Sequence, residues 1–218
     1  MLLENLKTEY DNMQKIYGDP SLHSIYFGGK IKNPDICFVF MNPTGKNIAS
    51  NIDWNGIRAP WVGTKTIWDL FVATNIFSKD LYNEIKSKKP CDWTEEFANI
   101  VYNEVAHNNL FITNLGKCTQ IDAKPISNAI YKKYLTLLEE EISIVNPKVI
   151  ILFGNQVSTV FLNENISVSK SRKKEYIKVI KGKEYKCYSV FYPVGNGRFN
   201  INKAIEDINF IKTKITQN

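Results

Sequence analysis

Short, unbroken hydrophobic runs predict the buried strands of this protein. The clearest are residues 35–41 (DICFVFM), 109–113 (NLFIT) and 148–153 (KVIILF), each followed by a polar, turn-rich stretch. Runs of this length without alternation are typical of strands that are covered on both faces, as in a parallel sheet. Residues 176–180 and 185–191 flank the turn signal Lys-Gly-Lys-Glu, which predicts a hairpin whose second arm is a further core strand.

Between these runs, hydrophobic residues recur at three- and four-residue spacing and predict helices. The strongest case is residues 125–145, where Ile130, Tyr134 and Leu138 share one helical face before Asn-Pro at 146–147 ends the pattern. Weaker patterns of the same kind predict helices over residues 3–16, 64–73, 93–106, 155–162 and 201–212.

The alternation of predicted strands and helices favours a three-layer α/β/α sandwich with a short, mainly parallel central sheet. No repeat, low-complexity tract or linker divides the sequence, so we expect a single domain over residues 1–218. In open α/β sheets, ligands bind beyond the carboxyl ends of the strands. Candidate chemistry is therefore sought in the segments that follow the strands.

Composition narrows the class of partner only slightly. The net charge of +6 suits a polyanion such as DNA, although a solvated lysine-rich surface explains it equally well. No apolar run reaches the roughly 20 residues that cross a bilayer, and the first residues are acidic, so we expect a cytoplasmic protein with no membrane partner.

The cysteines and histidines do not form a familiar metal motif. Cys37, Cys91, Cys118 and Cys187 are scattered, and the chain has only two histidines. We therefore expect reduced thiols, no metal and no cofactor. With no coiled-coil signal in the sequence, we also expect a monomer without an obligate protein partner.

Four segments, taken in order, resemble the uracil-DNA glycosylase superfamily over about residues 35–205. Residues 40–45 (FMNPTG) are similar to the water-activating motif of the mismatch-specific and single-strand-selective branches, with Phe40 where those branches have glycine. The resemblance implies that Asn42 orients the attacking water and that Pro43 lines the base site. An Asn-Pro turn after a strand is the plain structural alternative.

The next two segments resemble the base-binding part of the family. In residues 56–63 (GIRAPWVG) the resemblance makes Trp61 the aromatic residue that stacks on the extruded base. In residues 110–118 (LFITNLGKC) it makes Asn114 the reader of the polar edge of the base, with Lys117 as a DNA contact. A half-buried aromatic and a turn-capping asparagine are the alternatives for Trp61 and Asn114. Residues 138–162 resemble the helix-strand-helix that supports the site.

The fourth segment, residues 192–198 (YPVGNGR), occupies the place of the His-Pro-Ser loop that enters the minor groove. Tyr192 stands where many members have a catalytic histidine. Gly195, Asn196 and Arg198 are expected to approach the DNA backbone, because glycine permits close contact and arginine grips phosphate. Phe199 is either a wedge or a core residue. Lysines of the predicted hairpin, residues 170–186, either follow phosphates beside this loop or are simply solvated. Only one cysteine, Cys118, has a counterpart in the iron-sulfur branches, so no cluster is expected.

These residue types suit the hydrolysis of an N-glycosidic bond. An asparagine amide offers a hydrogen-bond donor and an acceptor side by side. This pair complements O4 and N3-H of uracil but does not match the donor and acceptor order of cytosine. Bond cleavage builds positive charge on the sugar and negative charge on the base, so electrostatic stabilisation and a positioned water can replace a strong base.

We therefore expect a monofunctional DNA glycosylase that flips a base out of DNA, with uracil as the leading candidate. Phe40, Tyr192 and an insertion at residues 47–55 favour, as an alternative, another deaminated or phage-modified base and a role in anti-phage defence. A non-catalytic DNA-binding module is the third alternative.

Overall fold

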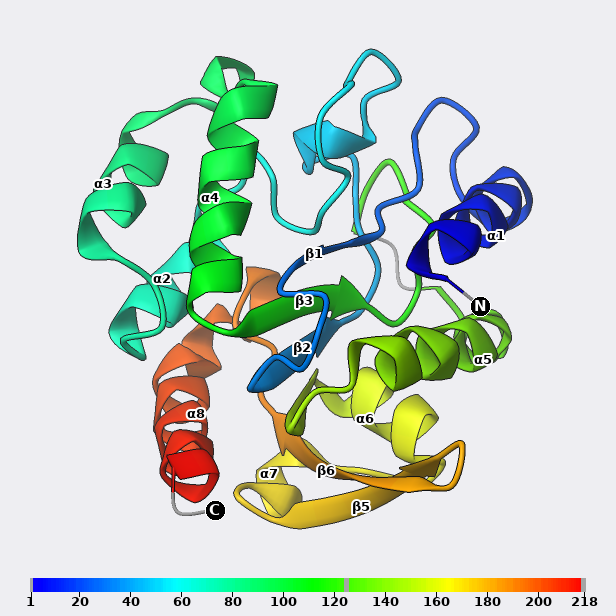
Figure 1. Cartoon of the computed structure of the whole chain (residues 1–218), viewed down its shortest axis with the longest axis vertical. Helices are drawn as coiled ribbons and strands as arrows, with labels where there is room; N and C mark the ends of the chain where they lie inside the picture. The colour runs from blue at the N-terminus through cyan, green and yellow to red at the C-terminus, as the bar shows by residue number, and fades with distance from the viewer. Residues whose placement is uncertain (1, 124–125, 217–218) are drawn as a thin grey trace.

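A six-stranded sheet forms the centre of the computed structural model, which describes residues 2–123 and 126–216 (Figure 1). The strands run in the order β1-β3-β2-β4-β6-β5. Their bounds are β1 Phe27–Gly29, β2 Ile36–Phe40, β3 Leu110–Asn114, β4 Val149–Phe153, β5 Glu175–Ile180 and β6 Lys183–Val190. The four central strands are mutually parallel, whereas β1 and β5 are antiparallel at the two edges. The sheet is therefore mixed, with the expected parallel centre.

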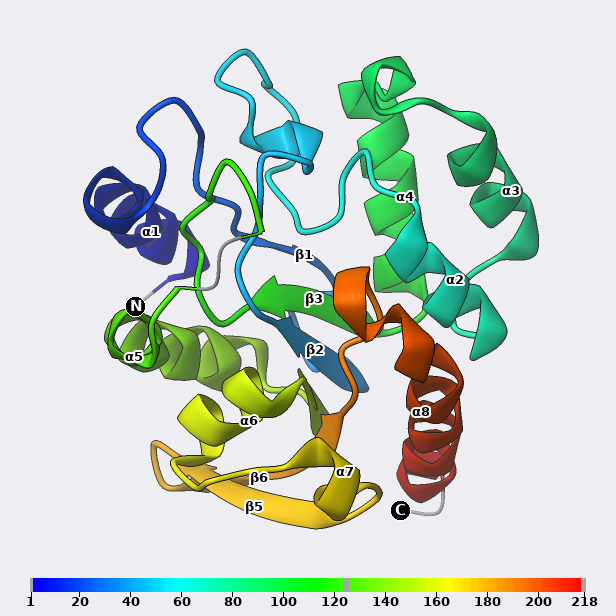
Figure 2. The ribbon, with the colours of Figure 1, turned by 180° about the vertical axis from the view of Figure 1, so that it is seen from behind.

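Helices cover both faces of this sheet (Figures 1 and 2). Helices α2, α4 and α8 pack with one face of the strands, and α1, α5 and α6 with the other. Alternate residues of β2 show why: Phe38 and Phe40 belong to the first hydrophobic cluster, and Cys37 and Val39 to the second. The predicted three-layer arrangement is confirmed.

The helix bounds agree closely with the predicted ones. The helices are α1 Leu3–Tyr17, α2 Thr66–Ala73, α3 Lys79–Ser87, α4 Glu95–His107, α5 Asn128–Val145, α6 Asn155–Leu162, α7 Val168–Ser171 and α8 Ile201–Thr216. Helix α5 begins later than predicted because the Ser127 side chain caps it, accepting from the amide of Ile130. The predicted start at Pro125 lies outside the described residues. Helices α3 and α7 were not predicted.

The β5–β6 hairpin is tighter than expected. Ile180 pairs directly with Lys183, which leaves only Lys181 and Gly182 in the turn. Their φ angles of 49° and 79° are those of a type I′ turn, whose twist matches that of the flanking strands. Strand β6 then pairs in parallel with β4, so the second arm is a core strand, as predicted.

The carboxyl ends of β2, β3, β4 and β6 lie at one edge of the sheet, and the segments that follow them meet there. Strand β1 was not predicted because its sequence, Phe-Gly-Gly, contains no hydrophobic run. Within the part of the chain that the structure describes, no helix is both long and apolar enough to cross a membrane.

Candidate active site

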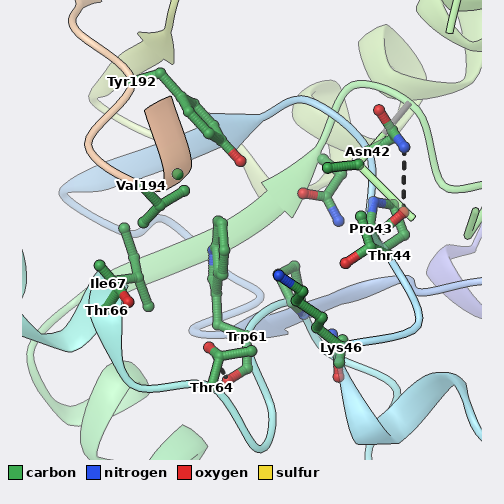
Figure 3. Close-up of a pocket in the computed structure, with 15 residues that line it drawn as sticks. Asn42, Pro43, Thr44, Lys46, Trp61, Thr64, Thr66, Ile67, Tyr192 and Val194 are labelled. Carbon is green, nitrogen blue, oxygen red and sulfur yellow. Dashed lines mark hydrogen bonds between the residues drawn. The ribbon is translucent and has the colours of Figure 1, made fainter. Parts of the chain in front are cut away.

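A pocket of about 250 Å³ opens at the carboxyl ends of the parallel strands. Five residues singled out from the sequence line it, and they come from four separate segments: Asn42, Pro43, Trp61, Asn114 and Tyr192 (Figure 3). The structure thus brings together all of the predicted catalytic and base-binding residues. Most of the pocket wall is apolar, as is usual for small-ligand sites, with a few polar groups among the lining residues.

Sheet pairing explains why Asn42 and Asn114 meet. Phe40 of β2 lies beside Asn114 of β3, and the pairing continues past the strand ends. The amide of Leu115 donates to the Phe40 carbonyl at 2.7 Å, and the amide of Gly116 donates to the Met41 carbonyl at 3.0 Å. The two asparagines are therefore held by the same backbone hydrogen bonds that hold the centre of the sheet.

The carboxamide of Asn42 is oriented by a residue that the sequence analysis did not single out. The Tyr131 hydroxyl, from α5, donates to Asn42 Oδ1 at 2.7 Å, and Asn42 Nδ2 donates to the Pro43 carbonyl at 3.1 Å. Burial raises the pKa of Tyr131, so its hydroxyl stays protonated and remains a donor. One lone pair of Asn42 Oδ1 remains to accept a hydrogen bond from a water molecule.

Asn114 is almost fully buried, with 2% of its surface exposed at the floor of the pocket. Its Nδ2 has no hydrogen-bond partner among the described residues. An unpaired buried amide donor costs about 1–3 kcal/mol, so it calls for an explanation. A bound ligand with a carbonyl group would supply the missing acceptor.

Trp61 has an unusual backbone conformation, with a φ of 72°. The strained region is costly for a bulky residue and persists only where the surroundings enforce it. Here the Trp61 carbonyl accepts from both the amide and the hydroxyl of Thr64, at 3.1 Å and 2.8 Å. The Tyr102 hydroxyl also donates to the carbonyl of Pro60. The ring is thereby held against the pocket.

Phe40, which replaces the family glycine, does not line the pocket but supports its aromatic walls. Its ring is buried and stacks on Phe153 at a centroid distance of 4.3 Å. The Trp61 ring meets it edge-on at 5.0 Å and the Tyr192 ring at 6.4 Å. The departure at this position therefore fills the space beneath the two aromatic rings rather than blocking the site.

Tyr192 faces the same space as Trp61, and its hydroxyl points into the pocket (Figure 3). Burial raises its pKa, so the phenol is neutral at physiological pH. The chain after it winds into the 3-10 helix η3, Gly195–Asn200. A Cβ at Gly197 would lie only 2.0 Å from the Tyr192 carbonyl oxygen, so glycine is required for this close turn.

The predicted DNA contacts of this loop lie at the mouth of the pocket. Gly195 lines the pocket, and Asn196 and Arg198 are exposed. Phe199 is 95% exposed, so its interpretation as a core residue is wrong.

Lys117 is not placed to contact DNA, which corrects the interpretation drawn from the sequence. The side chain is 0% exposed and forms an ion pair with Glu141 of α5 at 3.0 Å. It also donates to the Tyr26 carbonyl at 3.1 Å and to the Thr113 hydroxyl. The loop after β3 turns inward at this point, so the ammonium lies on the α5 side of the sheet instead of reaching the surface.

The sequence left two alternatives for the hairpin lysines, phosphate contacts or solvated charge, and three of them bond to side chains of the protein instead. Lys178 pairs with Glu139 at 2.9 Å, Lys181 pairs with Glu140, and Lys183 donates to Asn146. The hairpin turn lies at the amino-terminal end of β6, opposite the end that leads to the Tyr192 loop. Lys178 and Lys181 therefore pair with acidic side chains of α5, Lys183 bonds its C-cap residue Asn146, and none of the three flanks the pocket.

Several polar groups of the pocket were missed by sequence reasoning. Lys46, Thr44, Thr64 and Thr66 all line it. Lys46 and Thr44 follow Asn42 within the same motif, which was the available signal. By contrast, only the folded chain reveals the contact of Tyr131 with Asn42. In the sequence, the position of Tyr131 on the inner face of the predicted helix indicates only an aromatic residue of the core.

The cysteines are unpaired. Cys37, Cys118 and Cys187 are buried, whereas Cys91 is exposed. Burial raises the pKa of Cys187 to about 12. No group of three or more His, Cys, Asp or Glu side chains suited to a metal ion occurs in the part of the chain that the structure describes.

A mixed α/β sandwich with an asparagine-bearing, aromatic-walled pocket at its strand ends has the architecture of a small-ligand site. Comparison with family models identifies the family: residues 28–204, well over half of the chain, match the uracil DNA glycosylase superfamily. The chain belongs to this superfamily. No match was found among curated proteins. Membership supports DNA as the partner and DNA glycosylase activity in general.

Proposed function

We propose that this protein is a monofunctional DNA glycosylase that extrudes uracil from DNA and hydrolyses its N-glycosidic bond with a water molecule. The observation that carries the proposal is the convergence of Asn42, Trp61 and Asn114 on one pocket, where the Asn114 amide nitrogen is buried without a partner among the described residues. A catalytically idle binding module would have no use for an oriented Asn42 beside this donor.

The geometry supports a distinct role for each side chain. Asn114 Nδ2 would donate to a carbonyl oxygen of the base, and Trp61 would stack on the ring, a contact worth about 1–3 kcal/mol. Asn42 Oδ1 would accept a hydrogen bond from the attacking water and hold it beneath C1′. Tyr131 is a positioning residue, because it acts through Asn42.

A DNA strand would bind across the mouth of the pocket. Arg198 would bind phosphate, and the exposed ring of Phe199 would enter the gap left by the extruded base, which offsets part of the lost stacking. Arg198→Ala should weaken binding to all DNA and reduce its salt dependence by about one phosphate contact. Phe199→Ala should impair excision from duplex DNA more than from single strands, which have no partner strand to separate.

The test is excision itself. The purified protein is incubated with single- and double-stranded oligonucleotides that carry uracil, hypoxanthine, xanthine or 5-hydroxymethyluracil, and with glucosylated phage DNA. Alkali-labile abasic sites are then scored. We expect uracil to be released fastest, because Asn114 is suited to its carbonyl edge. Preference for a modified phage base would replace uracil as the substrate and indicate a defence role.

Two matched variants separate catalysis from folding. Asn42→Ala should remove the water contact and abolish most of the activity while DNA binding persists. Asn103→Ala, an exposed asparagine of α4, should leave activity unchanged. Tight DNA binding by the wild type without abasic sites on any substrate would contradict the glycosylase and favour a binding module.

A further inference from the structure

Lys46 introduces a single positive charge into a pocket that is otherwise uncharged. Among the lining residues that the structure describes, it alone carries a formal charge. Figure 3 shows its ammonium end directed into the space between Trp61 and Pro43 rather than away from the pocket. No hydrogen bond or ion pair with another described residue occupies that ammonium group. The charge is therefore available to a ligand.

The backbone on both sides of Lys46 is fixed. The Gly45 amide donates to the Gln120 carbonyl at 2.8 Å. The Asn47 side chain, only 4% exposed, donates from Nδ2 to the Ala59 carbonyl at 2.8 Å and accepts from the Ala49 amide at 3.0 Å. Such contacts tie this loop both to the segment before Trp61 and to the segment after β3. The lysine is thus anchored at its base, and only its side chain needs to order on binding.

The proposed reaction creates a need for positive charge in this pocket. When the bond between C1′ and the base nitrogen breaks, its electron pair leaves with the base, which becomes an anion. The water oxygen bonds to C1′, and the proton that the water loses neutralises the base. Until that proton arrives, the base needs electrostatic stabilisation. Tyr192 is a neutral phenol in the place where many relatives carry histidine, and the asparagines carry no charge.

We propose that Lys46 stabilises the negative charge on the departing base, a catalytic role in the reaction proposed above and dependent on it. The ammonium acts from the wall opposite Tyr192, where a full charge compensates for the weaker dipole of the phenol. Because the ground-state base is neutral and the leaving base is anionic, the interaction strengthens as the bond breaks and accelerates the chemical step.

The experiment compares leaving groups. Single-turnover excision is measured at saturating enzyme on matched oligonucleotides that contain uracil or 5-fluorouracil, whose fluorine stabilises the base anion. Lys46→Met removes the charge at similar length, and Lys46→Arg retains it. Lys79→Met, at the exposed start of α3, is the control for net charge.

We expect Lys46→Met to slow uracil release by about 10- to 100-fold. The rate loss should not exceed the lower end of the range seen when one donor of an oxyanion hole is removed. The reason is that solvent partly screens the charge of Lys46. The loss on 5-fluorouracil should be several-fold smaller, and Lys46→Arg should recover most of the rate. Lys79→Met should match the wild type on both bases.

Other outcomes would overturn the assignment. Equal losses on both bases would mean that Lys46 does not act on the departing base, and a loss seen only below saturating enzyme would make Lys46 a phosphate contact. A borohydride-trapped adduct that requires Lys46 would make it a nucleophile. Wild-type excision that is unaffected by Lys46→Met would sink this inference alone. The absence of excision by the wild type on every base would remove the proposed function and this inference together.

Discussion

The buried ion pair between Lys117 and Glu141 allows a quantitative test of what holds the site together. Both side chains are 0% exposed, and the shortest separation of ammonium and carboxylate is 3.0 Å. Glu141 also accepts from the Tyr10 hydroxyl at 2.8 Å and from the Thr113 hydroxyl. Burial lowers the pKa of Lys117, while the adjacent Glu141 opposes that shift. The pair lies beneath the end of β3, next to Asn114.

The size of the effect follows from this burial. At 3.0 Å and an effective dielectric constant near 20, the attraction is about 5.5 kcal/mol. Removing two ions from water costs several kcal/mol each, so the intact pair contributes little net stability. Breaking it is different, because the remaining carboxylate stays buried without its cation. Lys117→Met should therefore lower the free energy of unfolding by about 3–5 kcal/mol.

The assay is equilibrium unfolding in urea, followed by tryptophan fluorescence. The double variant Lys117→Met/Glu141→Gln removes both charges, leaves an amide oxygen to accept from Tyr10 and an amide nitrogen that can donate to the Thr113 hydroxyl, and so should recover at least half of the loss. Lys148→Met is the matched control, because Lys148 pairs with Asp35 at 2.8 Å but is 63% exposed. That pair should contribute at most about 1 kcal/mol.

Two results would refute this reasoning. If Lys117→Met costs no more than Lys148→Met, the buried charge is not stranded, and water or a rearranged side chain reaches Glu141. If the double variant is as unstable as the single one, the loss comes from packing of the lysine stem rather than from the unpaired carboxylate. A change in the urea dependence itself would indicate an altered unfolded state and call for calorimetry.

Three further predictions concern the site and the thiols. Tyr131→Phe deletes the hydroxyl that orients Asn42, so the excision rate should fall about 10-fold at saturating DNA, with KM nearly unchanged; a change in KM alone would contradict the positioning role. Trp61→Ala should weaken binding of uracil-containing DNA by about 1–3 kcal/mol relative to undamaged DNA, measured by fluorescence anisotropy at fixed salt. A thiol reagent at pH 8 should label Cys91 quickly and the buried cysteines only on unfolding. The raised pKa of Cys187, about 12, leaves this thiol almost entirely protonated at pH 8. Rapid labelling of the Cys91→Ser variant would refute this prediction.

The sequence predicted much of the fold because local patterns report burial directly. The runs at residues 35–41 and 148–153 are apolar on both sides, which only a doubly covered strand tolerates, and they became β2 and β4. Strand β1 escaped prediction because two of its three residues are glycine, and its place at the sheet edge depends on pairing with β3. Helix α3 was missed because its short amphipathic pattern has a single fully buried residue, Ile85.

For the candidate site, too, some features follow from the sequence and others only from the tertiary structure. The sequence by itself determined which residue types follow the strands, because turn residues are a local property, and the resemblance of four segments in order then singled out Asn42, Trp61, Asn114 and Tyr192. Tertiary structure decided where individual side chains point. Lys117, three residues beyond the end of β3, turned inward because Glu141, on a distant helix, offered a buried carboxylate.

Lys46 turned toward the pocket instead, and Phe199 toward solvent, although nothing in the adjacent sequence distinguishes these outcomes. The orientation of a charged or aromatic side chain depends on partners that are far away in sequence, such as Tyr131 for Asn42. A periodic pattern reveals which face of an element is buried, because burial repeats with the backbone geometry. The partner of a single polar group has no period, so only the folded chain specifies it.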